Sequence, residues 1–268
     1  MYIKKIHIQN YRNFNDFTME FHKGLNVIIG ANNAGKTGLL RAINLLKNPS
    51  DISVDDLDEE SFKIFRREAL QSKRMTQEEL NISNEELLSK LHLMSNGKLK
   101  RSAVLLFYHD PSIVQVGSHV QIGKFGEGAD LQYQDALEES LICIADKVIN
   151  LIYLKYLKAK ITYENDRRVE TYPFARDAVR EAVYNAIAHN CYMFGSPIQI
   201  RIEEDAMIIS NQCILPEGWT VDTLMQTHES KPYNPEIANV FYRAGYIERW
   251  GRGIEKICDA WEWSESTF

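Results

Sequence analysis

A phosphate-binding loop is the first feature of the sequence whose residue types and spacing could do chemistry. Eight residues beginning at Gly30 read GANNAGKT, which fits the pattern G-x-x-x-x-G-K-T. In such a loop the backbone N–H groups wrap the phosphates of a nucleotide, and we expect Gly30, Asn33 and Gly35 to form this wrap. Lys36 would neutralise the β- and γ-phosphates, and Thr37 would ligate Mg²⁺. The sequence therefore predicts ATP and Mg²⁺ as cofactors.

The segments around this loop have the pattern that the motif needs. Residues 25–29 are a largely apolar run typical of a buried strand, and residues 39–46 place apolar side chains at helical spacing. Two further strands are expected earlier, one around Ile6 and Ile8 and one from near Phe17. The alternative is a chance match in a glycine-containing turn, but a strand before the motif and a helix after it favour the phosphate loop.

A second group of chemically capable residues lies on a helix that we expect over 174–189. Glu181, Asn185 and His189 are four residues apart, so their side chains share one edge of that helix. The amide oxygen of Asn185 can ligate Mg²⁺, and Glu181 is a candidate general base for a water that attacks a phosphate. The alternative is the ordinary polar edge of an amphipathic helix, whose apolar face consists of Ala178, Val179, Ala182, Val183, Ala186 and Ile187.

The rest of the chain predicts a mixture of helices and strands without internal repeats. The expected elements, in chain order, are short polar helices over 61–101 (one of them over 83–93), strands over 103–107 and 114–122, a long helix over 135–158, a hairpin over 161–169, strands over 198–202 and 206–210, and helices over 234–244 and 253–261.

Composition and charge exclude several classes of protein. The chain has 268 residues, of which 44% are hydrophobic and 25% charged, so disordered, collagen-like and coiled-coil classes are excluded. The net charge of −6 argues against a protein that coats nucleic acid by charge alone. A local basic cluster could contact a nucleic-acid backbone, but a solvated helix face is the favoured interpretation of Lys63, Arg66, Arg67, Lys73 and Arg74.

Cysteine, histidine and hydropathy patterns bear on metals and membranes. The four cysteines have no metal-binding spacing, and the seven histidines include no H-x-x-x-H pair, so we expect no zinc site. No stretch approaches the roughly 18 apolar residues of a membrane span, and we expect no leader peptide. We therefore expect a cytoplasmic protein without a membrane partner.

The N-terminal segment resembles a known group of ATPases. The sequence IKKIHIQNYRNF followed by GLNVIIGANNAGKT is similar to the start of RecF/SMC/OLD-type ATPases. Hydrolysis in that group needs an apolar strand ending in Asp-Glu and an LSGG-like signature, and neither is evident here. Asp110 follows an apolar run, but no glutamate follows it, so an ordinary strand and turn is favoured. The resemblance implies ATP binding at this loop, and the two missing motifs argue against hydrolysis there.

The region from about Asp51 to Ala260 resembles a second family, the Schlafen/AlbA-type transcriptional regulators that are also called RecG-like. The similarity rests on collinear segments, among them KLKRSAVLLFYHDP, YPFARDAVREAVYNAIAHNCY and SKPYNPEIANVFYRAGYIERWGRGIEKI. It implies a GHKL-like ATP-binding fold, in which a layer of helices lies on a sheet. By position, it implies nucleotide-binding roles for Glu181, Asn185, His189, Asn211, Gly251, Arg252 and Gly253.

One departure from that family bears on activity. Where the family has Asn-Pro-Gly-Gly-Leu-Pro, this chain has Asn211-Gln212-Cys213-Ile214-Leu215-Pro216. The lost glycines put side chains where backbone would approach a nucleotide, which argues against turnover there.

We place a phosphate-loop segment at 1–46, a linker at 47–60, an α/β connecting region at 61–160 and a GHKL-like region at 161–268.

Three functional hypotheses follow from these features. The first is an ATP-binding regulatory protein in transcription control or another DNA transaction, which contacts DNA through a partner or a further domain. The second is a RecF/OLD-like P-loop ATPase in DNA repair or phage defence, and the third is a non-catalytic interaction protein. Homo-oligomerisation is left open by the sequence.

Overall fold

A computed structural model of the protein describes residues 4–11, 14–24, 52–164, 166–226, 229, 231–248, 253–254 and 257–258. Its first element is a hairpin in which β1 (Lys5–Tyr11) pairs antiparallel with β2 (Phe14–Glu20). The two strands expected at the N-terminus are therefore confirmed. The expected strand over 25–29, the phosphate loop and the helix after it lie outside the described residues.

Short helices follow, as the sequence predicts for 61–101. They begin after Asp58, Thr76 and Ser83, whose side chains accept backbone N–H groups of the first turn. These N-caps satisfy donors that a helix leaves unpaired at its start. The elements are η2 (Val54–Asp56), α2 (Glu59–Gln71), α3 (Gln77–Leu80) and α4 (Asn84–Lys90), followed by a small hairpin of β3 (Met94–Ser95) and β4 (Lys98–Leu99).

The strand expected over 103–107 is wrong, because this run is a helix. It belongs to α5 (Arg101–Phe107), which buries the whole run. A short run that is apolar on all sides is buried in either conformation, so its periodicity does not distinguish helix from strand. The strand expected over 114–122 is wrong in its bounds, since η3 (Pro111–Ile113) comes first and β5 is Val120–Phe125.

The long helix expected over 135–158 is wrong in its first part. Residues as far as Leu137 belong to strand β6 (Leu131–Leu137), and α6 (Leu141–Leu151) begins only after Ser140. The Ser140 side chain accepts the Cys143 N–H at 3.2 Å, so this serine sets the start of the helix. A π-helical turn, η4 (Ile152–Tyr156), ends it.

A four-stranded sheet with the order β10-β9-β5-β6 carries the helices. Its strands β9 (Ile198–Ile202) and β10 (Met207–Ser210) lie where the sequence predicts them. β5 runs parallel to β9, and the other neighbours are antiparallel. One face of the sheet buries alternate residues, among them Val120, Ile122, Ile198, Ile200 and Ile202.

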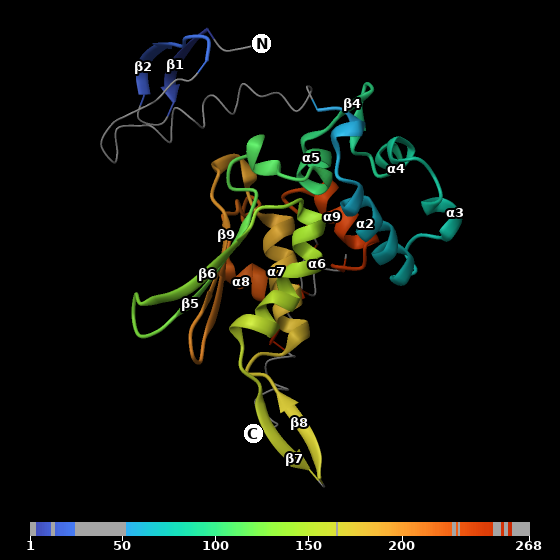
Figure 1. The fold of residues 1–268 in the computed structure, drawn as a ribbon, viewed down its shortest axis with the longest axis vertical. Coiled ribbons are helices and arrows are strands. Elements are labelled where there is room, and N and C mark those ends of the chain that lie inside the picture. Colours follow the sequence, from blue (N-terminus) through green and yellow to red (C-terminus); the bar gives the residue numbers. More distant parts are fainter. Residues whose placement is uncertain are drawn as a thin grey trace.

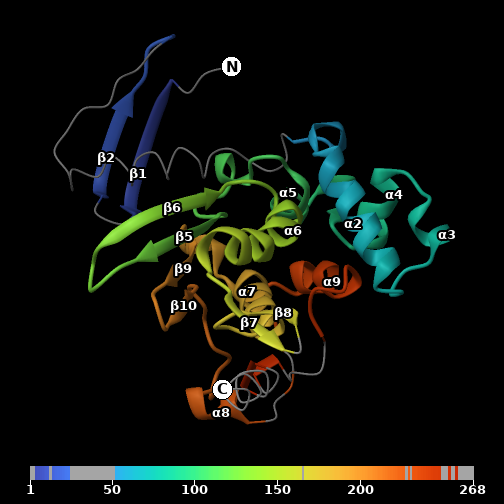
Figure 2. The same ribbon diagram turned by 60° about the horizontal axis from the view of Figure 1, so that its bottom comes forward.

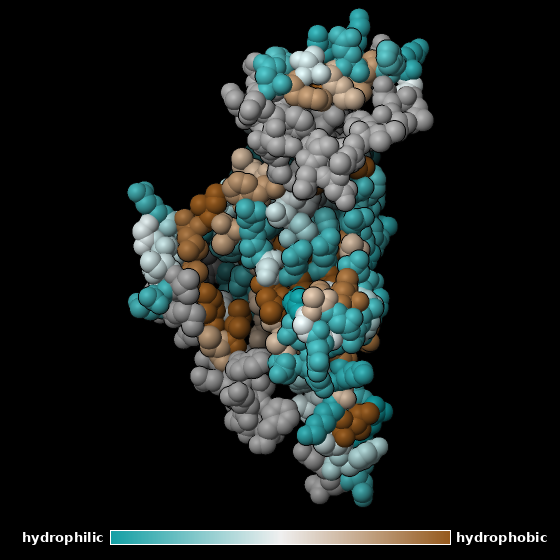
Figure 3. Space-filling view, turned by 90° about the vertical axis from the view of Figure 1, so that its left-hand side faces the viewer, coloured by the Kyte–Doolittle hydropathy of each residue, from teal (hydrophilic) through white to brown (hydrophobic). Residues whose placement is uncertain are grey.

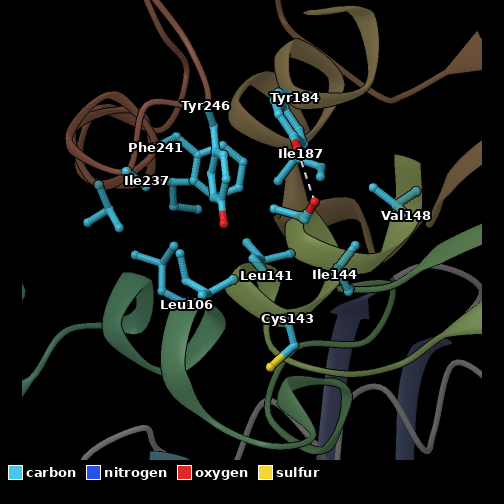
Figure 4. Close-up of a cluster of buried hydrophobic side chains, with 14 of the residues drawn as sticks. Leu106, Leu141, Cys143, Ile144, Val148, Tyr184, Ile187, Ile237, Phe241 and Tyr246 are labelled. Carbon is cyan, nitrogen blue, oxygen red and sulfur yellow. Dashed lines mark hydrogen bonds between the residues drawn. The ribbon is translucent and has the colours of Figure 1, made fainter. Parts of the chain in front are cut away.

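Two layers of helices lie on one side of this sheet. Figure 2 shows α6 and α7 (Arg176–His189) beside the strands, and α9 (Pro235–Arg243) on the far side of α7. Leu106, Leu141, Ile187 and Phe241 bring α5, α6, α7 and α9 together in one apolar core (Figure 4). The prediction of a mixed α/β chain with helices on a sheet is confirmed, as are the helices expected over 174–189 and 234–244. Of the helix expected over 253–261, the described residues 253–254 and 257–258 are helical.

The remaining elements lie at the edges of this body. β7 (Lys160–Glu164) and β8 (Arg167–Thr171) form the expected hairpin, which extends away from the helices (Figure 1). Two short helical segments, η5 (Tyr192–Phe194) and α8 (Val221–Met225), flank β9 and β10 in the sequence. Figure 3 shows one side of the molecule, where apolar residues gather around a hollow that hydrophilic areas surround.

Candidate nucleotide site

Helix α7 holds two of the predicted site residues by burying its opposite face. Val183 and Ile187 are fully buried, and α7 packs against α6, α9 and β10. Glu181 is only 8% exposed, although it carries a carboxyl group, and Asn185 is half-buried one turn further along. A carboxyl group is rarely placed in such a position without a partner, because burying a charge costs free energy.

Glu181, Asn185 and Gly253 meet at one point. The Asn185 amide Nδ2 donates a hydrogen bond to Glu181 Oε1 at 3.1 Å. A Cβ placed on Gly253 would lie 2.6 Å from Asn185 Nδ2 and 2.7 Å from Glu181 Oε1. The Gly253 backbone therefore lies directly against both functional groups, which a Cβ at this position would displace.

This arrangement has the groups that a magnesium-bound nucleotide requires. Because Nδ2 of Asn185 bonds the carboxyl group, its Oδ1 is turned away, and no donor among the described residues bonds it. Amide and carboxylate oxygens are ligands that Mg²⁺ prefers, and a backbone cradle at a glycine suits phosphate oxygens. A buried carboxylate at this point can also accept a proton from a water molecule.

A second set of polar groups lies beyond the C-terminal end of α7. Asn190 is fully buried, and its Oδ1 accepts the Gln212 N–H at 3.2 Å. The Cys191 N–H donates to the Gln212 carbonyl at 2.5 Å, so the segment after β10 is tied to the end of α7. The Nδ2 atoms of Asn190 and Asn211 are both buried and have no hydrogen-bond partner among the described residues. Unpaired buried donors are uncommon, and these two could serve an acceptor group of a ligand.

The structure places the other predicted site residues as follows. His189 is half-buried in the last turn of α7, one turn beyond Asn185. The side chains of Cys213 and Ile214, which replace the two expected glycines, are exposed, as is that of Gln212 before them. Seven predicted residues lie outside the described part of the chain, namely Gly30, Asn33, Gly35, Lys36, Thr37, Gly251 and Arg252.

Asn190 is not among the residues that the sequence predicts for the site. Its only signal is that an asparagine directly follows the last turn of the helix, which is common at helix ends and has no chemical implication. Its burial and the bond to the segment after β10 depend on packing between residues 22 positions apart.

The basic cluster of 63–74 is a solvated face only in part, because Lys63, Arg67 and Lys73 are exposed but the arginines bond other elements of the fold. Arg66 donates to the carbonyl groups of Leu80 and Ile82 at 3.1 and 2.9 Å. Arg67 bonds Asp146 on α6, and Arg74 bonds carbonyl groups after α9. These guanidinium groups hold elements of the fold together, so their arrangement does not indicate a DNA contact.

A cavity of about 700 Å³ lies away from this site, between the β5–β6 turn, η4 and the β9–β10 turn. Two of its lining lysines are engaged within the fold. Lys124 donates to the Glu203 carbonyl at 2.7 Å, and Lys155 pairs with Asp135 at 2.6 Å. Burial and the hydrogen bond to Asp135 raise the pKa of Tyr156, whose hydroxyl also donates to the Ile122 carbonyl. These bonds give Lys124, Lys155 and Tyr156 a structural role in the cavity wall.

Two absences hold for the described residues only. Within 4–11, 14–24, 52–164 and the later described ranges, no cluster of three His, Cys, Asp or Glu residues could hold a metal ion. No helix in the same part of the chain has both the length and the apolar character needed to cross a membrane.

Comparison with known proteins divides the chain near the end of α7. The model of the family described as "AAA ATPase domain" matches residues 1–184, which include the phosphate loop and Glu181. The model described as "Putative ATP-dependent DNA helicase recG C-terminal" matches residues 195–267, which include Asn211 and Gly253.

Several DNA replication and repair proteins named RecF are similar to parts of the chain. The protein of Streptococcus suis is 46% identical over 46 residues, which are 17% of this chain and 13% of that protein. The protein of Bacillus cytotoxicus is 36% identical over 108 residues, covering 38% of this chain and 28% of that protein. The protein of Caldanaerobacter subterraneus is 28% identical over 164 residues, covering 59% and 43%. The chain spans less than half the length of these relatives.

A solved structure shares the fold. The crystal structure of the DIP2311 protein from Corynebacterium diphtheriae superposes with a TM-score of 0.62, over 78% of this chain and 41% of that one. At 19% identity this likeness concerns the fold alone.

The expected likeness to RecF and the RecG-like character of the C-terminal region are confirmed. The AAA ATPase domain model matches residues 1–184, which are more than half of this chain, so the chain belongs to the AAA ATPase domain family.

Proposed function

We propose that this protein is an ATP-binding protein of DNA maintenance, with the phosphate loop of residues 30–37 as its main nucleotide site. One observation carries the proposal: a complete G-x-x-x-x-G-K-T motif lies within the region that the AAA ATPase domain model matches. Membership of that family implies ATP binding. The RecF relatives favour DNA repair over transcription control as the setting.

Within this proposal the loop binds the nucleotide but does not itself supply a complete hydrolytic site. Lys36 and Thr37 provide the charge and the hydroxyl ligand for Mg-ATP. The acidic residue nearest in pattern to a hydrolytic one, Asp110, is engaged elsewhere. Its carboxylate accepts the Ser112 N–H at 3.1 Å and caps η3, so it serves the local turn.

The α7 site is our second candidate nucleotide site, and a specific observation favours it. A Cβ at position 253 would come within 3 Å of side-chain atoms of both Glu181 and Asn185, so the glycine backbone lies directly against these two groups. There Asn185 Oδ1 would ligate Mg²⁺, Glu181 would accept a proton from water, and the unpaired amides of Asn190 and Asn211 would bind acceptor atoms of the nucleotide.

The DNA role can be tested by the anisotropy of labelled duplex DNA. We expect tighter DNA binding with Mg-ATP than with Mg-ADP or no nucleotide, and loss of this difference in Lys36→Ala. Lys47→Ala is the matched control, since it removes a lysine of the linker directly after the phosphate-loop segment, outside the motif. DNA binding that ignores nucleotide in every variant would contradict the proposal.

The second site can be tested in the Lys36→Ala background, where the phosphate loop no longer contributes. We expect residual Mg-ATP binding that Asn185→Ala abolishes. Asn150→Ala is the control, because Asn150 is an exposed residue of the neighbouring α6 that only accepts a bond from Arg176 at 2.6 Å. Equal binding by both asparagine variants would refute the second site.

A further inference from the structure

The turn that follows α9 is held by side chains from two other helical regions. We call residues 242–248 the α9 turn. Gly245 has a φ of +83°, its N–H donates to the Tyr242 carbonyl, and the Tyr246 N–H donates to the Phe241 carbonyl, both at 2.9 Å. This is the Schellman arrangement that ends many helices at a glycine. A Cβ on Gly245 would lie 2.7 Å from Ser72 Cβ, so the turn also packs closely on the end of α2.

Arg74 reaches the α9 turn from the segment after α2. Its guanidinium group donates to the carbonyls of Tyr242 and Ile247, the latter at 2.7 Å, and to Glu248 Oε1 at 3.0 Å. The same group lies 4.2 Å from the centre of the Tyr242 ring. Ser72 adds a bond to the Arg243 carbonyl at 2.9 Å.

Arg180 reaches the α9 turn from α7 itself. Its Nη2 donates to the Gly245 carbonyl at 2.7 Å. Arg180 directly precedes Glu181, so one helix both bonds the α9 turn and carries the carboxyl and amide groups against which Gly253 lies. Only seven residues separate Gly245 from Gly253, and α7 contacts the chain at both positions.

We propose that Arg180, supported by Arg74, is a positioning residue that holds Gly253 against Glu181 and Asn185. The inference rests on the second nucleotide site proposed above, and it adds the residues that control its geometry. Arginine suits this task because its planar group presents several donors at fixed angles, which a lysine cannot reproduce. Residues that orient a metal site from outside it typically change metal affinity by about 10- to 100-fold when altered.

The test compares two arginines of the same helix. Arg180→Lys keeps the charge but loses the fixed geometry of the bond to Gly245. Arg176→Lys is the matched control. Arg176 also makes one side-chain bond, to Asn150 Oδ1 at 2.6 Å, and it lies 4.9 Å from the centre of the Tyr153 ring, as Arg180 lies 5.4 Å from that of Tyr184. Both variants are made in the Lys36→Ala background, and Arg74→Lys is added as a third.

Two measurements separate the outcomes. Hydrogen exchange of the peptide that contains Gly253 and Ile254 reports the contact directly, and Mg-ATP affinity reports its consequence. We expect Arg180→Lys to speed this exchange and to weaken Mg-ATP binding about tenfold, Arg74→Lys to act in the same direction, and Arg176→Lys to leave both within about twofold.

Failure of the positioning role and failure of the nucleotide site give different results. If Arg180→Lys leaves exchange at Gly253 as slow as Arg176→Lys does, the positioning role is overturned, whatever the nucleotide affinity. If exchange becomes faster but the Lys36→Ala parent binds no Mg-ATP, the positioning role stands and the second nucleotide site is refuted.

Discussion

Replacing Gly253 with alanine tests the α7 site most selectively. The new Cβ would lie 2.6 Å from Asn185 Nδ2 and 2.7 Å from Glu181 Oε1, whereas ordinary contacts begin at 3.4 Å. The two side-chain ends must therefore move by about 0.7 to 0.8 Å, away from the positions in which they bond each other. Gly253→Ala should consequently displace the proposed Mg²⁺ ligand and proton acceptor together.

The effect on stability should be small because two contributions oppose each other. Overpacking costs about 1–3 kcal/mol. Alanine is favoured over glycine in a helix by roughly 0.8–1.0 kcal/mol, and Gly253 is helical. The free energy of unfolding should fall by about 0–2 kcal/mol. Mg-ATP affinity at the α7 site should fall at least about tenfold, which corresponds to roughly 1.4 kcal/mol.

The assay measures urea unfolding and Mg-ATP binding in the Lys36→Ala background. Gly123→Ala is the matched control, since its Cβ would meet the ring of Phe125 at 2.8 Å in β5, a similar clash with a side-chain end away from the site. We expect similar losses of stability in both variants and a loss of affinity only in Gly253→Ala. Unchanged affinity in Gly253→Ala would refute the argument.

Three further predictions concern the fold. Tyr246→Phe should preserve or raise stability, because the buried Tyr246 hydroxyl has no partner among the described residues. Tyr184→Phe should cost about 1 kcal/mol, because it loses a 3.0 Å bond to the Ala145 carbonyl on α6 (Figure 4). Urea unfolding of the two variants tests both expectations. Leu106→Ala, at a fully buried position, should cost about 2–5 kcal/mol in the same assay. The Asp58 carboxyl is partly buried, which raises its pKa, but hydrogen bonds from Ser61 and from a backbone N–H outweigh this and leave the pKa below its usual value. Its contribution is therefore present above about pH 4 and lost as the pH falls through the lowered pKa. Asp58→Ala should cost about 0.5–2 kcal/mol at neutral pH and progressively less as the pH falls in acid titrations of unfolding.

The helices that carry their own start signals could be predicted from the sequence. Ser83 and Thr76 precede glutamates by three residues, and those helices lie where expected. The failures occurred where the decisive contact was not local. The run over 103–107 is a helix buried on all sides, which its apolar pattern does not distinguish from a buried strand, and residues before Leu137 form a strand because β5 pairs with them. Neither the surroundings of the first run nor the strand that pairs with the second can be recognised from the sequence of the run itself.

The candidate site shows the same division. The spacing of Glu181 and Asn185 on one helix edge could be predicted because it depends only on helical geometry. A glycine at 253 could be noted, but its approach to those two groups depends on the path of the chain after α9. Asn190 could not be predicted, since its burial follows from the contact with Gln212.

The claim that this member of the AAA ATPase domain family binds ATP at its phosphate loop is tested most directly by calorimetric titration of Mg-ATP into the intact chain and into Lys36→Ala. We predict saturable binding to the intact chain, with most of the heat lost in Lys36→Ala and the remainder lost when Asn185→Ala is added. Equal heats for the intact chain and Lys36→Ala would contradict the central claim, and no heat in any of them would refute ATP binding altogether.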